Sequence, residues 1–205
     1  MLPALIVGVP VVLAFAMLWW SRGGMIDWAI SRERLAAGEW PLIGLHMLAH
    51  GGILHLGFNM AALLALTPAV MDRLGPSTPR GIFAYIVLLG LSGLGGLALW
   101  LAIPHLAPML GLSGAIFGLV GFILRQPDPD GLPAPLTSRN TGRAFWIFIK
   151  LHLPLIAIFA IPLLLGAEGF GLAWEAHLGG FIAGLLLYHP MRALAGTEAH
   201  WPTAR

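Results

Sequence analysis

The sequence predicts an all-α membrane protein, a bundle of six transmembrane helices. Of its 205 residues, 58% are hydrophobic and only 10% are charged, whereas water-soluble domains carry about a quarter charged residues. The few charges also leave six apolar stretches close to the length that crosses a bilayer as a helix, roughly 17–25 residues. These stretches are residues 2–20, 54–71, 81–103, 110–124, 144–166 and 171–190. We expect one transmembrane domain over 1–205 and no separate soluble domain.

Each stretch has its own features. The first lacks the basic start and small-residue cleavage site of a signal peptide, so it is expected to remain as a helix. The second begins with histidines and Asn59, and the third is rich in glycine. The fourth is short, and the fifth contains Lys150, which can extend toward the headgroups. The sixth carries His177 near its start.

The distribution of Lys and Arg predicts the orientation. Cytoplasmic loops carry the excess of these residues, which places both termini in the cytoplasm and loops one, three and five outside. The net charge of +2 is too small to suggest nucleic acid as a partner, and the absence of cysteine excludes a thiolate nucleophile. The second and fourth loops are flanked by Arg73, Arg80, Arg125, Arg139, Arg143 and Lys150, and the C-terminal tail holds Arg192 and Arg205.

A polar cluster, "HMLAHGGILHLGFNM", marks the start of the second span. His55 and Asn59 are four residues apart, so they share one face of a helix. Polar residues inside a membrane are functional candidates, although a single histidine is also explained as a hydrogen bond between helices. A metal site at His46, His50 and His55 is a third possibility, but the second span brings no nearby carboxylate ligand.

The tetrapeptide "GLSG" occurs twice, around Ser92 and around Ser113. Ser113 and His177 both lie about 7–9 Å below the outer ends of their spans, whereas Ser92 lies about 16 Å deep. Ser92 is therefore interpreted as a packing residue among glycines. Gly111 and Gly114 leave the backbone around Ser113 uncovered. On the last span His177, Gly180 and Gly184 share one face, so that another helix can approach closely.

These residue types suit nucleophilic catalysis. A serine hydroxyl is activated by a base within hydrogen-bond reach, which His177 can provide for Ser113. The side chains of His55 and Asn59 and the backbone N–H of Ser113 can stabilise the oxyanion. No carboxylate is well placed as a third member, so a dyad is predicted, and no cofactor or metal is required. His152 is expected in the inner half of its span, away from the dyad.

The motifs "HGGILHLGFNM", "GLSGAIFG" and "AHLGGFIAG", on the second, fourth and sixth spans, resemble those of the rhomboid intramembrane serine proteases. The resemblance implies a Ser113–His177 dyad, an oxyanion site at His55 and Asn59, and a supporting role for His50. Phe117, where the family commonly has Tyr, could still stack on His177.

The same resemblance implies substrates that are transmembrane segments of other proteins, cut near the outer face. The expected location is a prokaryotic cell (inner) membrane. The first loop should be structured, although Trp40 is followed by Pro41 where many relatives have Trp-Arg. A catalytically silent, client-binding relative is the alternative, which the presence of both Ser113 and His177 disfavours.

Overall fold

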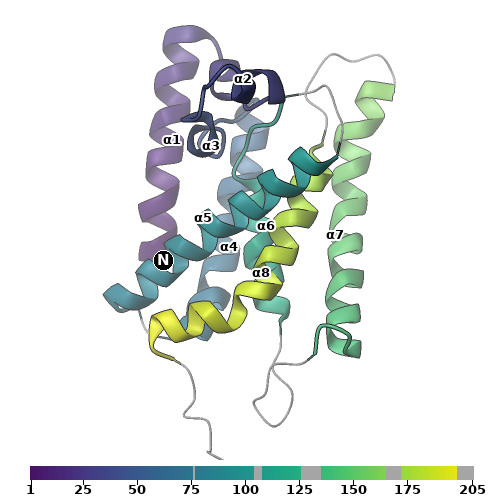
Figure 1. Cartoon of the computed structure of the whole chain (residues 1–205). Helices are drawn as coiled ribbons and strands as arrows, with labels where there is room; N and C mark the ends of the chain where they lie inside the picture. The colour runs from purple at the N-terminus through teal and green to yellow at the C-terminus, as the bar shows by residue number, and fades with distance from the viewer. Residues whose placement is uncertain (76, 104–107, 126–134, 165–171, 198–205) are drawn as a thin grey trace, which may run out of the picture.

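A computed structural model describes residues 1–75, 77–103, 108–125, 135–164 and 172–197, without the side chains of 159–164. Within these ranges the chain is almost entirely helical (Figure 1). The helices of the bundle are α1 (Leu2–Arg22), α4 (Ile53–Leu74), α5 (Pro79–Ala102), α6 (Ser113–Leu124), α7 (Arg139–Leu164) and α8 (Trp174–Ala195). Three short helices connect α1 to α4, namely η1 (Ile26–Trp28), α2 (Arg32–Ala36) and α3 (Leu42–Leu45).

Each of the six predicted spans corresponds to one helix of the bundle. In the described part of the chain, α1, α4, α5, α7 and α8 are long and apolar enough to cross a membrane. The exception is α6, whose 12 residues extend about 18 Å at 1.5 Å per residue. The predicted all-α membrane bundle is thereby confirmed. The predicted helix ends at residues 165–166 and 171 lie outside the described ranges.

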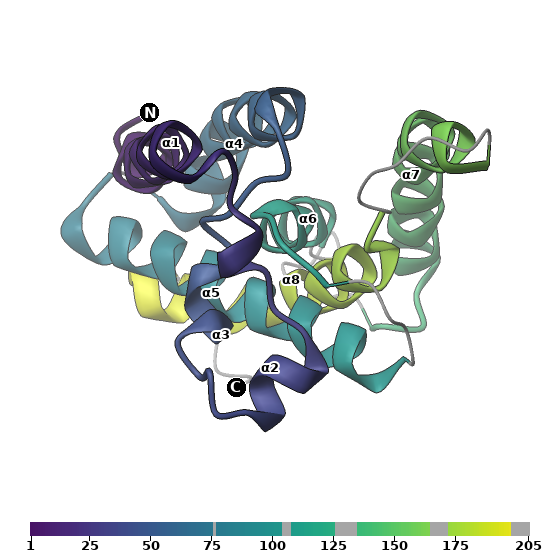
Figure 2. The same cartoon turned by 90° about the horizontal axis from the view of Figure 1, so that it is seen from above.

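The short helix α6 occupies the centre of the bundle, with α4, α5 and α8 around it (Figure 2). A helix that is apolar on all sides is stable only when it is surrounded by protein or lipid. Buried residues cover every side of α6, among them Ala115, Ile116, Leu119 and Phe122. The helix is therefore internal to the bundle, and the residue at its start is positioned by the helices around it.

Glycines bring α8 against α6 at backbone distance. A Cβ added to Gly180 would lie 1.9 Å from the carbonyl oxygen of Gly114, and one added to Gly184 would lie 1.9 Å from that of Gly118. Small residues allow such close approach of membrane helices. The glycine face predicted on the last span therefore packs on the helix that begins with Ser113.

Helix α7 stands apart from this glycine-packed centre (Figure 2). Its lower half attaches through an apolar cluster in which Ala144 and Phe148 pack with Phe117 of α6 and with Phe181 and Leu185 of α8. The rings of Phe148 and Phe181 lie 4.6 Å apart. The contact relies on large side chains, in contrast to the backbone contacts between α6 and α8.

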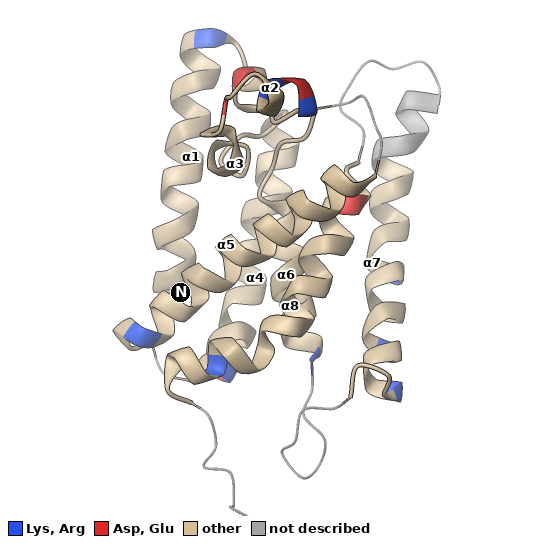
Figure 3. Cartoon of the chain, viewed as in Figure 1, with Lys and Arg blue, Asp and Glu red and all other residues tan. Residues whose placement is uncertain are grey.

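Charged residues separate to the two ends of the bundle (Figure 3). One end, where α4 is followed by α5 and α7 begins, carries mostly Lys and Arg. The other end, at α2 and the start of α8, carries acidic residues together with a few arginines. This separation is the pattern on which the predicted orientation rests.

Candidate active site

The site begins where the chain enters α6. The sequence predicted a helix from residue 110, but α6 starts at Ser113. Gly111 adopts φ +123°, which is incompatible with a right-handed helix and favours glycine. Its N–H donates instead to the carbonyl of His46, at 2.8 Å. The helix is therefore stopped by Gly111, and Ser113 becomes its first residue.

The connection between α1 and α4, here called the first loop, contacts the chain that leads from α5 into α6. Ile30 and Met109 form an antiparallel bridge with N···O distances of 2.8 and 2.9 Å. The guanidinium of Arg32 donates to the carbonyls of Leu101 and Ile103, the latter at 3.0 Å, where α5 ends. The first loop therefore fixes both the end of α5 and the approach to Ser113.

Arg34 organises the first loop itself. Its guanidinium forms an ion pair with Glu39 and donates to the carbonyl of Ala29 at 2.9 Å. The hydrogen bond from Arg34 holds the pKa of Glu39 below its ordinary value. Trp40 is exposed, and Pro41 precedes the first residue of α3. Arg34 thus supplies an arginine anchor that the Trp40–Pro41 sequence lacks.

Ser113 and His177 are in direct contact. The Oγ of Ser113 lies 2.7 Å from the Nε2 of His177, which is within hydrogen-bond reach. His177 is buried, and the ring of Phe117 stacks on it with a centroid separation of 4.5 Å and an interplanar angle of 26°. Phe117 therefore orients the imidazole by ring contact, as expected for this position.

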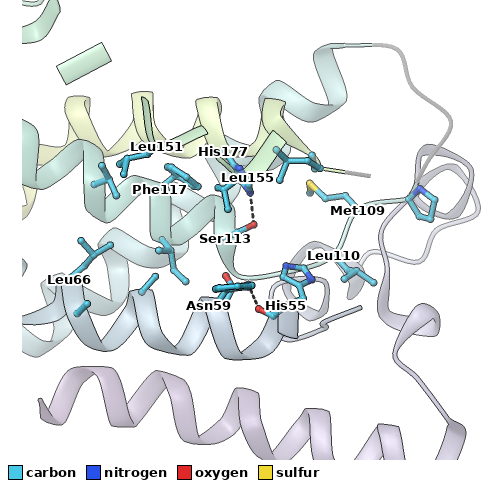
Figure 4. Close-up of a pocket in the computed structure, with 18 residues that line it drawn as sticks. His55, Asn59, Leu66, Met109, Leu110, Ser113, Phe117, Leu151, Leu155 and His177 are labelled. Atoms are coloured by element: carbon cyan, nitrogen blue, oxygen red, sulfur yellow. Dashed lines mark hydrogen bonds between the residues drawn. The ribbon is translucent and has the colours of Figure 1, made fainter. Parts of the chain in front are cut away.

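His55 and Asn59 approach Ser113 from the side opposite His177 (Figure 4). The His55 ring rests on Gly111, since a Cβ there would meet the ring at 2.9 Å. The Nδ2 of Asn59 donates to the carbonyl of His55 at 2.9 Å. All four side chains line one cavity of about 420 Å³. The structure thus brings the four predicted site residues together.

Comparison with known proteins places this arrangement in a family. The Rhomboid domain matches residues 37–193. The chain belongs to the rhomboid family. The rhomboid protease GluP of Bacillus subtilis (strain 168) is 30% identical over 155 residues, which cover 73% of this rhomboid and 26% of GluP. The candidate rhomboid protease YdcA of the same strain is 33% identical over 90 residues, 44% of this chain and 43% of YdcA.

A third relative is of another kind. The autoinducer 2 import system permease protein LsrC of Yersinia enterocolitica (serotype O:8 / biotype 1B, strain NCTC 13174 / 8081) is 35% identical over 96 residues, 46% of this chain and 27% of LsrC. The rhomboid chain spans about a quarter of the length of GluP and of LsrC, at 26% and 27%. The domain match over most of the chain therefore carries the family assignment.

The three histidines of the metal interpretation, His46, His50 and His55, each hydrogen-bond to a different backbone group. The Nδ1 atoms of His46 and His50 face the carbonyls of Leu42 and Leu48, at 2.9 and 3.3 Å. The Nδ1 of His55 accepts from the N–H of Gly51, at 3.4 Å. Among the described residues no three His, Asp or Glu side chains are grouped to hold a metal ion. These contacts give no support to the histidine-metal interpretation.

His50 packs against His55. Its ring is buried and meets the ring of His55 edge-on, with centroids 5.0 Å apart. Burial, with a smaller contribution from His55, lowers the pKa of His50 to about 4. His50 is therefore neutral near pH 7 and adds no positive charge beside the rhomboid cavity.

The prediction for His152 is wrong. Its Nε2 lies 2.9 Å from the Nδ1 of His177, so His152 adjoins the Ser113–His177 pair. Depth counted along a single helix misplaces this residue, because the helix ends are not level and α7 rises above the start of α8 (Figure 1). A titratable side chain within a span is the sequence signal that could have identified this residue of the rhomboid site.

Ser92 lies in a different environment, as predicted. It is fully buried on α5, and its side chain occupies the space that a Cβ on Gly118 of α6 would need, 2.1 Å away. Its Oγ has no hydrogen-bond partner within the described residues. Ser92 is therefore a packing residue between two helices of the rhomboid bundle.

Proposed function

We propose that this rhomboid is an intramembrane serine endopeptidase that cleaves transmembrane segments of membrane-protein substrates. The single observation that carries the proposal is the 2.7 Å contact between the Oγ of Ser113 and the Nε2 of His177 at the wall of an accessible cavity. Family membership and the relatives named as rhomboid proteases support the same reaction class.

The reaction proceeds through an acyl-enzyme. His177 takes the proton of Ser113 as its Oγ attacks the peptide carbonyl, and returns that proton to the leaving amine. The acyl group is then transferred to water, which His177 deprotonates, and the carboxylic product leaves with Ser113 restored. No external oxidant, metal or cofactor takes part.

Three donors are available for the oxyanion. The backbone N–H of Ser113 is at the first turn of α6 and has no helical carbonyl partner. His55 and Asn59 face the same cavity from α4. Each donor pointing at the developing charge lowers the barrier, and loss of one such donor in a serine protease costs about 10²–10³ in rate.

The lining of the cavity supports the proposed class of substrate. One wall of the cavity comes from α4, with Phe58 and Leu66, and another comes from α7, with Leu151 and Leu155. These side chains are apolar, whereas the polar groups gather around Ser113. A transmembrane segment that locally unwinds can therefore keep its apolar side chains covered while one extended peptide bond reaches the serine.

The charge pattern supports a proposed orientation in the membrane. We place both termini in the cytoplasm of a prokaryotic cell and the opening of the site toward the outside, so that cleavage occurs near the outer face. A single transmembrane domain over 1–205 is part of the same proposal. Reporter fusions to the ends of the chain would contradict this orientation if they were accessible from outside.

Labelling with a fluorophosphonate tests the proposal. The purified protein, Ser113→Ala, His177→Ala and Ser92→Ala are compared at equal amounts. We expect the wild type and Ser92→Ala to be labelled and the other two not, because labelling needs both the nucleophile and its base. Labelling that persists in Ser113→Ala would overturn the assignment. Loss of proteolysis on chelation, with labelling intact, would favour the metal alternative instead.

A further inference from the structure

We propose that His152 is the positioning residue of this site. It accepts the Nδ1–H of His177 and so holds the base in the tautomer that can receive the proton of Ser113. The inference rests on the proposed function of the Ser113–His177 pair and adds a third helix, α7, to the machinery.

Three hydrogen bonds connect α7 to the nucleophile in series. The Nδ1 of His152 lies 3.2 Å from the carbonyl oxygen of Phe148. The Nε2 of His152 lies 2.9 Å from the Nδ1 of His177. The Nε2 of His177 lies 2.7 Å from the Oγ of Ser113. Both nitrogens of both rings are therefore in use.

The first partner fixes the direction of the whole series. A carbonyl oxygen can only accept, so the Nδ1 of His152 must carry the hydrogen. In a neutral ring its Nε2 is then an acceptor, which requires a hydrogen on the Nδ1 of His177. The Nε2 of His177 is left with a free lone pair facing the hydroxyl of Ser113. This is the only neutral arrangement in which all three bonds form, and it is the one that general base catalysis needs.

Packing holds the ring of His152 in this orientation. The side chain is buried, with the ring of Phe148 at 4.1 Å on its own helix and the ring of Phe117 at 4.5 Å from α6. Phe117 lies 4.5 Å from His152 and also 4.5 Å from His177. One aromatic side chain thus aligns both imidazoles, and rotation of His152 would lose these contacts.

His152 takes the place that a carboxylate has in a Ser-His-Asp triad, but its side chain is neutral. In a Ser-His-Asp triad the carboxylate both fixes the tautomer and stabilises the imidazolium, and losing the correct tautomer costs about 10⁴ in kcat. His152 supplies the first effect and only a dipole for the second. Its loss should therefore cost less than loss of a triad carboxylate.

The position of His152 on α7 has a structural consequence. Leu151 and Leu155 of the same helix form a wall of the cavity, and α7 attaches to the bundle through the cluster around Phe148. An outward displacement of α7 would separate His152 from His177. Alignment of the base therefore depends on α7 being docked.

Two substitutions separate hydrogen bonding from packing. His152→Gln places a carbonyl oxygen near the former Nε2 and keeps an acceptor, whereas His152→Leu fills the volume without one. The measurements are the rate of fluorophosphonate labelling and the ¹⁵N NMR spectrum of histidine-labelled protein, with the His177 signals assigned by their loss in His177→Ala.

We expect His152→Leu to slow labelling about 10- to 100-fold, by analogy with loss of the hydrogen-bond partner of a metal-bound histidine. The His177 signals should shift from the Nδ1–H toward the Nε2–H tautomer. His152→Gln should label within about threefold of wild type, since an acceptor remains. An unchanged His177 tautomer in His152→Leu would overturn the proposal, as would equal slowing by His152→Leu and His152→Gln. Absence of labelling in the wild type, with the tautomer shift still observed, would overturn the protease function alone.

Discussion

The two copies of Gly-Leu-Ser-Gly share every letter and differ in backbone. Residues 90–93 lie inside α5, where the chain is helical on both sides. Residues 111–114 lie where α6 begins, and Gly111 has φ +123°. The first copy buries Ser92 completely, whereas the second brings Ser113 to a cavity and to His177. A helix start, more than the tetrapeptide, makes a serine available for chemistry.

The largest difference is expected from the serines themselves. Ser113→Ala should lower kcat/KM for a transmembrane substrate by at least about 10⁴-fold, because the nucleophile is lost. Ser92→Ala should stay within about threefold of wild type, and its thermal midpoint should be unchanged or higher, since it removes a buried hydroxyl that lacks a partner. Both are measured in the same detergent. A comparable loss of activity in the two variants would contradict the assignment of Ser113 as nucleophile and Ser92 as packing residue.

The first glycines of the two copies give the next largest difference. A Cβ on Gly111 would meet the His55 ring at 2.9 Å, in a backbone conformation that side chains rarely adopt, whereas one on Gly90 meets nothing within 4 Å. Gly111→Ala should therefore destabilise the protein by about 1–3 kcal/mol and slow cleavage about 10- to 100-fold by displacing an oxyanion donor.

Gly90→Ala is the matched control for that substitution. It should stabilise α5 by roughly 0.5–1 kcal/mol, because alanine is the better helix former. Chemical unfolding and cleavage assays on both variants give the comparison. If Gly111→Ala were as stable and active as Gly90→Ala, the contact between Gly111 and His55 would not matter for the site.

A smaller effect, confined to stability, is expected where Ser92 meets α6. Gly118→Ala would place a Cβ 2.1 Å from the Ser92 side chain, so overpacking should cost about 1–3 kcal/mol. Adding Ser92→Gly exchanges the two sizes across the contact and should recover part of that loss. Unfolding of the two single variants and the double variant measures the coupling. Strict additivity would show that the two positions do not touch in the folded protein.

Composition and charge spacing were sufficient to predict the helices, because a bilayer permits few other structures for uncharged segments. Depth counted along each helix was sufficient to separate Ser113 from Ser92. The same count failed for His152, whose contact with His177 depends on how high α7 stands relative to α8. Relative height is a tertiary property, and one helix pattern does not encode it.

Local backbone geometry was the other limit. The predicted helix start at residue 110 did not include the hydrogen bond from the N–H of Gly111 to the carbonyl of His46, which Gly111 makes in a non-helical conformation. Without the Trp-Arg pair, the sequence shows no arginine anchor for the first loop, and in the structure Arg34, six residues before Trp40, organises it. Hydrogen bonds between distant segments decide both features, so that periodicity and motif spacing could not predict them.

The smallest effect is expected from substitutions in the first loop. This loop contacts the segment that leads to Ser113, whereas Ser92 is buried between helices. Glu39→Gln removes the charge that pairs with Arg34. The hydrogen bond from Arg34 lowers the pKa of Glu39 from 4.5, so the pair stabilises the loop above that pH and its contribution is lost as the pH falls through the lowered value. Wild type should therefore have the higher thermal midpoint at pH 7, and the difference should vanish on acidification.

Labelling of Ser113 should change by less than about twofold in Glu39→Gln, because exposed ion pairs contribute little. Asp27→Asn is the matched control, since it removes the ion pair of Arg22 with Asp27 at the end of α1, where both side chains are more exposed. That variant should show no change in labelling. If Asp27→Asn changed labelling more than Glu39→Gln, the end of the first loop next to α1, and not the Arg34–Glu39 pair, would be the part that positions Ser113.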